Sequence, residues 1–227
     1  MIYAVSDLHG CFEKYQKLLE SINLRDDDTL YVLGDVVDRG EHGMEIIKDL
    51  AKRKNVITLK GNHDHTAAVL LRLFGFSDKS EKSGELKKVF YLWLSDGGEV
   101  TYRSFLRLDD ADKQFVLDFL DSLRLKKSLT VGKQKFLLSH TVPSKNKMIH
   151  PERLVASDYI IGEPEYEKVY FDDTIIVTGH TPTSFIDPSY EGRIWRGNNH
   201  IAIDCGAVFG NPLGCLCLDT LEEIYIS

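Results

Sequence analysis

Short apolar segments alternate with helical patterns over the first sixty residues. Residues 2–5, 29–33 and 56–59 have the length and the β-branched content of buried strands. Apolar residues recur at helical spacing between them, first at Phe12, Tyr15, Leu18, Leu19 and Ile22 and then at Met44, Ile47, Leu50 and Ala51. This alternation predicts βαβ units and a largely parallel sheet, whose functional loops follow the carboxyl ends of the strands.

The pattern changes twice in the rest of the chain. Residues 65–125 are helical in pattern, apart from a polar interruption at residues 77–84, and predict a helical insertion. Short strand segments follow at residues 136–138, 175–177, 201–203, 215–218 and 223–226, and predict a second sheet. We therefore expect an α/β fold, a two-sheet sandwich flanked by helices, formed as one domain over residues 1–227 with the insertion at about 65–125.

Composition limits the possible partners. The 227 residues include 28 Lys and Arg against 35 Asp and Glu, a net charge of −7, and no block of five or six basic residues occurs. Such a chain has no long-range attraction for nucleic acid. The apolar segments are far shorter than the roughly 20 residues that cross a bilayer, and the N-terminus lacks a basic leader. We expect a cytoplasmic protein with neither nucleic acid nor membrane as partner.

Polar clusters follow five of the predicted strands. They are SDLHG at residues 6–10, GDVVDRG at 34–40, GNHD at 61–64, and the histidines that end LLSH at 140 and VTGH at 180. A parallel sheet gathers such residues at one edge. Carboxylate, carboxamide and imidazole ligands without thiolate suit a pair of cations, with Mn²⁺ first and Fe or Zn²⁺ as alternatives. Without cations, so many buried polar groups would be costly, which argues against a merely structural polar edge.

These motifs closely resemble the metal-dependent phosphoprotein phosphatase group of the calcineurin-like metallophosphoesterases. The group includes bacterial serine/threonine phosphatases and diadenosine tetraphosphatases, and IAIDCGAVFGNPLGCLCLD near the end is similar to its closing strands. The resemblance implies a first metal held by Asp7 and His9, with Asp35 as the bridge. It implies a second metal completed by Asn62, His140 and His180.

The resemblance also implies the catalytic residues. Arg39 matches the arginine that holds phosphate oxygens, and His63, oriented by Asp38, matches the proton donor to the leaving group. The chemistry requires such groups, because a planar guanidinium fits phosphoryl oxygens and an alkoxide leaving group needs an acid. The family's second phosphate-binding arginine has no match, since Arg153 lies between the last two ligand histidines in an unrelated context.

Aromatic residues near the motifs have two interpretations. Phe74, Phe76, Tyr91 and Trp93 could form a platform for a base, although packing of the insertion is the commoner role. Trp195 and Phe209 could line a groove, but aromatic residues beside strands usually belong to the core, and we expect both there.

We predict a two-metal phosphohydrolase in which a metal-bridging hydroxide attacks the phosphate ester directly, without a covalent enzyme intermediate. The compact chain and its ending resemble the small serine/threonine phosphoprotein phosphatases, and this resemblance implies action on phosphorylated proteins or peptides. GNHD favours the alternative, a bis(5'-nucleosyl)-tetraphosphatase acting on a nucleotide substrate. An alternative of another class is a non-catalytic scaffold that docks phosphorylated partners. The intact set of His63, Asp38 and Arg39 argues against the scaffold.

Overall fold

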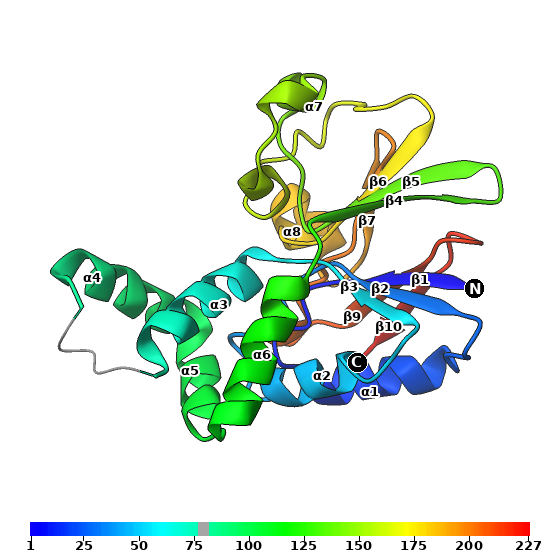
Figure 1. Cartoon of the computed structure of the whole chain (residues 1–227). Coiled ribbons are helices and arrows are strands. Elements are labelled where there is room, and N and C mark those ends of the chain that lie inside the picture. Colours follow the sequence, from blue (N-terminus) through cyan, green and yellow to red (C-terminus); the bar gives the residue numbers. More distant parts are fainter. Residues whose placement is uncertain (77–81) are drawn as a thin grey trace.

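Two five-stranded sheets pack face to face in the computed structural model, which describes residues 1–76 and 82–227 (Figure 1). The strand orders are β10-β9-β1-β2-β3 and β4-β5-β6-β8-β7. Helices flank the sandwich, with α1, α2 and α6 against the first sheet. The predicted α/β two-sheet sandwich is confirmed.

The first sheet contains the three strands predicted near the N-terminus. Strands β1 (Ile2–Val5), β2 (Thr29–Val32) and β3 (Val56–Thr58) are parallel. Strands β9 (Leu213–Cys217) and β10 (Glu223–Ile226) add an antiparallel pair on the other side of β1. The sequence pattern had placed these last two strands in the second sheet. They return to the first because the open edge of β1 needs a hydrogen-bonding partner.

The second sheet begins with a strand that the pattern did not predict. Strand β4 (Lys126–Val131) is antiparallel to β5 (Gln134–Ser139), followed by β6 (Thr174–Thr178), β8 (His200–Ala202) and β7 (Trp195–Gly197). Polar and partly exposed residues make up most of β4 at this edge, so it lacks the apolar run of a central strand. Strands β5, β6 and β8 are parallel.

Helices follow the strands and fill the predicted insertion. The α-helices are α1 (Phe12–Ser21), α2 (Gly43–Leu50), α3 (Asn62–Phe74), α4 (Gly84–Trp93), α5 (Glu99–Leu106), α6 (Asp110–Ser122), α7 (Lys145–Met148) and α8 (Thr183–Ile186). A π-helical turn, η2 (Leu94–Gly98), joins α4 to α5. Short 3-10 turns are η3 (Pro151–Arg153), η4 (Ala156–Tyr159), η5 (Pro188–Tyr190) and η6 (Ala207–Phe209). The predicted polar interruption at 77–84 lies largely outside the described residues.

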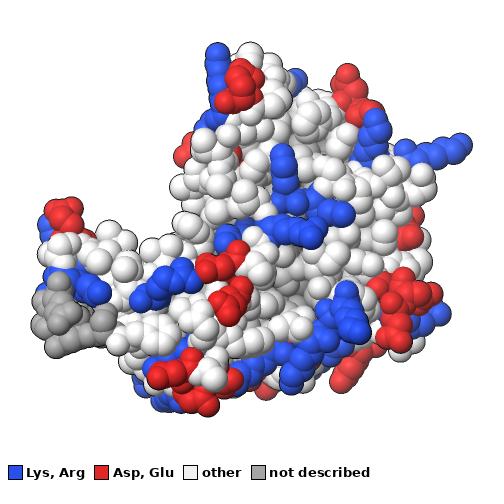
Figure 2. Space-filling model, in the orientation of Figure 1, with Lys and Arg blue, Asp and Glu red and all other residues white. Residues whose placement is uncertain are grey.

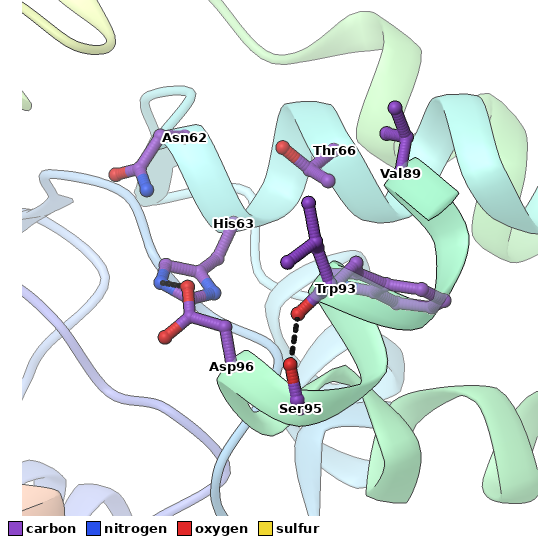
Figure 3. A pocket seen from close by; sticks show the side chains of 8 residues that line it. Asn62, His63, Thr66, Val89, Trp93, Ser95 and Asp96 are labelled. Atoms are coloured by element: carbon purple, nitrogen blue, oxygen red, sulfur yellow. Dashed lines mark hydrogen bonds and ion pairs between the residues drawn. The ribbon is translucent and has the colours of Figure 1, made fainter. Parts of the chain in front are cut away.

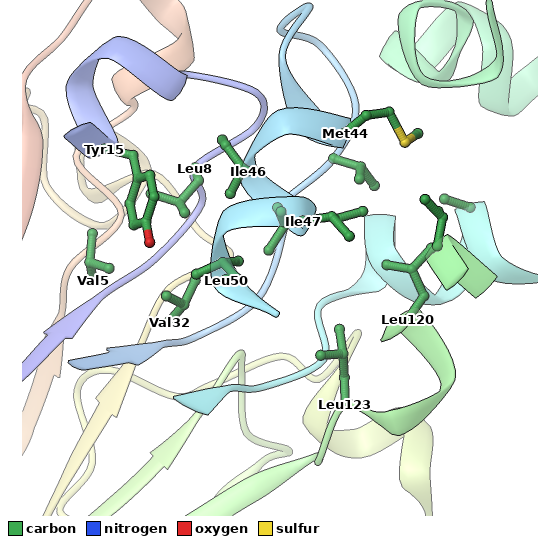
Figure 4. Close-up of a cluster of buried hydrophobic side chains, with 14 of the residues drawn as sticks. Val5, Leu8, Tyr15, Val32, Met44, Ile46, Ile47, Leu50, Leu120 and Leu123 are labelled. Carbon is green, nitrogen blue, oxygen red and sulfur yellow. The ribbon is translucent and has the colours of Figure 1, made fainter. Parts of the chain in front are cut away.

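Successive side chains along each strand point to opposite faces of the sheet, so the buried side chains form two layers. Tyr3 and Val5 of β1 face the helices, whereas Ala4 faces the second sheet. The layer under the helices also contains Tyr15 of α1 and Ile47 of α2 (Figure 4). Each such side chain contributes roughly 1.5 to 3 kcal/mol on burial, so both faces of the first sheet are held in place. The strand ends are therefore rigid supports.

Among residues 1–76 and 82–227, no helix is both long and apolar enough to span a bilayer. Basic and acidic side chains are interspersed on the face shown in Figure 2.

Candidate active site

The predicted ligands come from both sheets. Asp7 and His9 follow β1, Asp35 follows β2, and Asn62 begins α3 directly after β3. The second sheet supplies His140 after β5 and His180 after β6. We call these six residues the strand-end cluster. Four of them are buried, and Asn62 and His180 are partly exposed.

Asp35 lies at the centre of this cluster. Its Oδ2 atom is 3.6 Å from His9 Nε2 and 3.5 Å from His140 Nε2, while Oδ1 accepts a hydrogen bond from the His63 backbone amide at 3.0 Å. Two groups of possible metal ligands, each with ligand atoms within 4.8 Å of one another, share this carboxylate: His9, Asp35 and His63, and Asp7, Asp35 and His140. Asp35 is thus common to both groups of possible ligands.

Backbone carbonyls orient two of the histidines. His9 Nδ1 donates to the Val37 carbonyl at 2.8 Å, and His140 Nδ1 donates to the Leu33 carbonyl at 2.8 Å. Since a carbonyl only accepts, Nδ1 carries the proton in both rings. The Nε2 lone pairs then point into the cluster, as in histidines that bind metals.

Acceptor atoms meet on the second side of the cluster. His140 Nε2 lies 2.9 Å from Asn62 Oδ1 and 3.1 Å from His180 Nδ1. Burial lowers the pKa of His140 well below its ordinary value and lowers the pKa of His180 to about 4, so an added proton is disfavoured. With its single proton on Nε2, a neutral His180 turns the Nδ1 lone pair toward His140 Nε2 and Asn62 Oδ1, and three acceptors so placed fit a shared cation. The donor set therefore suits a divalent metal.

The buried carboxylates favour the same conclusion. Burial raises the pKa of Asp7 and of Asp35 well above the ordinary value, and the charges of Asp204 and Asp64, respectively, raise them further. A cation among these groups would compensate their charge. Asp204 follows β8 and was missed in the sequence, although its place directly after an apolar strand was the same signal that marked the others.

Strained backbone accompanies the site. Asp7, His9, Asp35, Asp38, Arg39 and His180 all have positive φ, between 39° and 70°. Such conformations are uncommon for residues other than glycine and persist where the surrounding structure enforces them. Gly61 and Gly179 permit the close packing, because a Cβ atom would lie 2.0 Å from Asp35 Oδ1 at Gly61 and 2.1 Å from Asp7 Oδ2 at Gly179.

The sequence motifs assign no role to Asp64, yet its side chain holds the loop that carries Asp35. Its carboxylate is buried and accepts the backbone amides of Asp35 at 2.8 Å, Val36 at 2.9 Å and Gly61 at 3.0 Å. These bonds join the ends of β2 and β3. The only local signal was its place in the GNHD motif.

The three predicted catalytic residues form a chain beside the cluster. His63 Nδ1 donates to Asp38 Oδ2 at 2.8 Å, and Arg39 Nη2 donates to His63 Nε2 at 2.9 Å. The other end of the guanidinium, Nη1, lies 2.5 Å from His9 Nε2. Arg39 therefore connects the histidine expected to donate a proton with the residues expected to hold metal.

The helical insertion supports this chain. Trp93 Nε1 donates to Asp38 Oδ2 at 2.7 Å, and the Asp38 amide donates to Thr101 Oγ1 at 2.9 Å. The Arg39 amide donates to the Gly97 carbonyl at 2.8 Å. Asp96 approaches from the same turn, with carboxylate oxygens 3.8 Å from His63 Nε2 and 3.9 Å from Arg39 Nη2 (Figure 3). We call Trp93, Asp96, Gly97 and Thr101 the insertion brace.

Two cavities flank the centre. The first, of about 550 Å³, has His63, Trp93 and Asp96 in its wall (Figure 3). The second, of about 510 Å³, is lined in part by Arg39, His180 and the exposed ring of Phe209. Phe209 therefore does not belong to the core as the sequence suggested, because the short turn η6 carries its ring outward.

Two other residues considered in the sequence lie apart from the centre. Trp195 is partly buried and packs edge to face against Tyr166, with 5.3 Å between the ring centroids. Arg153 is exposed and pairs with Glu152 at 3.6 Å, and it lines neither of the two cavities beside the centre.

Comparison with known proteins identifies similar chains. The profile of a family described as calcineurin-like phosphoesterase matches residues 1–209. The asymmetrical bis(5'-nucleosyl)-tetraphosphatase PrpE of Oceanobacillus iheyensis is 28% identical over 92% of this chain and 85% of its own length. A symmetrical bis(5'-nucleosyl)-tetraphosphatase of Haemophilus ducreyi is 43% identical over 30% of this chain, and the chain spans only 27% of that relative.

Solved structures support the fold. A crystal structure titled as a candidate diadenosine tetraphosphatase superposes with a TM-score of 0.65 at 17% identity, over 99% of this chain and 92% of the other. A serine/threonine protein phosphatase from Saccharomyces cerevisiae gives a TM-score of 0.59 at 14% identity, over 94% of this chain and 71% of its own. At such identities the likeness concerns the fold alone.

Proposed function

The chain belongs to the calcineurin-like phosphoesterases, a hydrolase family that uses divalent metals, and we propose that it cleaves phosphate esters or anhydrides at a two-metal centre. The strand-end cluster would hold both cations. The observation that carries this proposal is the position of Asp35 Oδ2, nearly equidistant from His9 Nε2 at 3.6 Å and His140 Nε2 at 3.5 Å. A carboxylate so placed can serve both sites.

The other residues have complementary roles in the proposed reaction. Bound cations would supply an activated water and compensate the charge of an in-line displacement. Arg39 would hold the phosphoryl oxygens through its planar guanidinium. Once Arg39 contacts the phosphoryl oxygens in place of the His63 ring, His63 protonated at Nε2 would donate that proton to the leaving group, while Asp38 accepts from Nδ1 and stabilises the protonated ring. No residue of the chain needs to form a covalent intermediate.

For the substrate we propose a dinucleoside polyphosphate. Support comes from the two relatives that carry tetraphosphatase names, one of which aligns over 92% of this chain. This preference reverses the order favoured by the compact length and the C-terminal motif. The metal centre itself does not discriminate, because phosphate esters and anhydrides present the same phosphoryl group.

A phosphorylated protein or peptide is the second candidate, and Asp96 favours it. Its carboxylate is 69% exposed at the edge of the cavity that also contains His63. A negative charge beside the proton donor repels an anionic nucleotide leaving group but tolerates the neutral alcohol of serine or threonine. The charge of Asp96 should therefore disfavour a nucleotide substrate more than a phosphorylated peptide.

Two assays test the proposal. Turnover of p-nitrophenyl phosphate with Mn²⁺, Fe²⁺ or Zn²⁺ separates a hydrolase from a docking scaffold, which would bind phosphorylated partners without releasing phosphate. Comparison of kcat/KM for diadenosine tetraphosphate and a phosphoserine peptide at equal Mn²⁺ then measures substrate discrimination. A higher value for the dinucleotide supports the first candidate, and a higher value for the peptide supports the second.

A further inference from the structure

We propose that the cavity containing Arg39, Phe185 and Phe209 binds the base of a nucleotide whose phosphate is held at the metal centre. This inference rests on the proposed function and specifies where the nucleoside lies. Aromatic rings are effective platforms for bases, because every base offers a flat face for stacking.

The exposure of the two rings is the first observation. Phe185 is 81% exposed, the largest fraction among the described large hydrophobic residues, and Phe209 is 64% exposed. Both line one cavity. Exposed aromatic rings that lie together beside a polar centre are typical of a ligand site, since their apolar surface otherwise remains in contact with water.

The segments that carry the rings are nevertheless fixed. Lys14 Nζ donates to the carbonyls of Ala207 at 3.1 Å and Asn211 at 2.5 Å, at the two ends of the loop that holds Phe209. The amide of Thr183, which begins α8 and precedes Phe185 by two residues, donates to the Asp204 carbonyl at 2.9 Å. Anchored segments with exposed rings form a site that loses little entropy on binding.

The cavity is continuous with the proposed phosphate site. Arg39 Cζ lies 5.5 Å from the centroid of the Phe209 ring, within the range of a cation–π contact. The same guanidinium contacts His63 and His9, and His180 also lines the cavity. A phosphate held by Arg39 thus has an aromatic face beside it, as a 5'-nucleotide requires.

The size and polar groups of the cavity fit a nucleoside. Its volume of about 510 Å³ lies within the range of small-molecule sites, roughly 300 to 1,000 Å³. Ser184, Glu191 and Asn211 add hydroxyl, carboxylate and amide groups that could contact ribose or the edge of a base. The cavity on the other side of the centre contains Asp96, which lies beside Arg39. The negative charge of Asp96 opposes a polyphosphate that approaches from that side.

The experiment isolates the base by comparing two ligands. Adenosine 5'-monophosphate and ribose 5-phosphate share the phosphate and the sugar, so the ratio of their dissociation constants reports the base. The constants would be measured by titration calorimetry with the Mn²⁺-loaded protein. Stacking predicts that the adenosine compound binds roughly 5- to 100-fold more tightly. Phe185→Leu and Phe209→Leu, which remain apolar, should lose most of this ratio.

Phe76→Leu is the matched control, because that ring is 49% exposed on the insertion and lines neither cavity beside the centre. It should keep the wild-type ratio. Equal affinity of the two ligands for the wild-type protein would overturn the inference, as would a ratio that neither cavity variant changes. Turnover of p-nitrophenyl phosphate is measured separately. Its absence would refute the proposed hydrolase, whereas the binding ratio judges the base site by itself.

Discussion

The strand-end cluster and the insertion brace surround one centre but are held in different ways. The cluster lies at the edges of two sheets, is largely buried, and includes four residues with positive φ. The brace contacts the centre from the end of α4, the turn η2 and the helix α5, through Trp93 on Asp38 and through Asp96, which is 69% exposed. Rigid strand ends suit metal binding, whereas the brace contacts Asp38 and His63, which we propose act on the leaving group. Substrate preference can therefore change in the brace without loss of the metals.

The strongest test of this division is Asp35→Asn in the strand-end cluster. One oxygen of the bridge becomes an amide nitrogen, so both metals should be lost. We expect kcat/KM to fall by about 10³-fold or more for every substrate. Metal analysis and kinetics on the same preparation measure the effect, with the exposed Asp27→Asn as control. Two tightly bound ions in Asp35→Asn would exclude the bridging role.

Removal of the metals should have the same effect as loss of the bridge. Dialysis against a chelator should abolish hydrolysis of all substrates, and added Mn²⁺ should restore it, because the residues of the chain do not supply an activated water by themselves. The hydrolysis rate and the amount of bound metal are both measured before and after dialysis. Hydrolysis that survives complete removal would disprove the metal mechanism altogether.

His63→Asn should produce the next largest effect, and a selective one. General acid catalysis commonly contributes about 10²- to 10⁴-fold, so turnover of substrates with basic alkoxide leaving groups should fall by that order. p-Nitrophenyl phosphate should lose much less, since nitrophenolate leaves without a proton. His65→Asn, exposed on the same helix, is the control. Equal losses for both leaving groups with full metal occupancy would argue against His63 as the acid.

Trp93→Phe tests the brace itself. A smaller aromatic ring replaces the indole, the hydrogen bond to Asp38 at 2.7 Å is lost, and His63 is then less well oriented. We expect about a 10-fold loss for alkoxide leaving groups, in line with one hydrogen bond to a charged acceptor, and unchanged metal content. Tyr91→Phe on the exposed face of α4 is the control. Loss of metal in Trp93→Phe would contradict the separation of cluster and brace.

Asp96→Asn should have the smallest effect. This exposed carboxylate lies 3.9 Å from Arg39 Nη2, and its removal should raise kcat/KM for diadenosine tetraphosphate by about 2- to 3-fold at low salt. High salt should abolish the gain, because exposed charges are screened. Kinetics at two ionic strengths provide the measurement, and the exposed Asp110→Asn should show no change. A gain that is independent of salt would indicate a different cause.

Much of the fold and of the centre could be predicted from local patterns. The strands β1, β5 and β6 have apolar residues that become buried on one or both faces, and their polar successors Asp7, His140 and His180 reach the centre. Strand β4 escaped prediction because an exposed edge strand has no apolar run. The order of the strands in the sheets could not be predicted either, because the pairing of β9 with β1 joins residues more than two hundred positions apart.

The brace and the aromatic cavity had no comparable local signal. Trp93 has the helical context of a core residue, and only the packing of α4 against the centre turns its indole nitrogen toward Asp38. Phe209 and Trp195 look alike beside strands, yet the turn η6 exposes one while Tyr166 covers the other. The orientation of Trp93 and the exposure of Phe209 and Trp195 depend on which distant segments of the chain pack against them.

The sequence by itself determined the alternation of strands and helices, the polar residues that follow the strands, and the chemical nature of the ligands. Periodicity and residue chemistry are local properties, and they persist in any arrangement of the chain. The tertiary structure decided the nearly equidistant position of Asp35, the support of Asp38 by the insertion and the presence of Phe185 and Phe209 in the wall of one cavity. Each of these depends on distances between segments that only the packing of two sheets and the insertion can set.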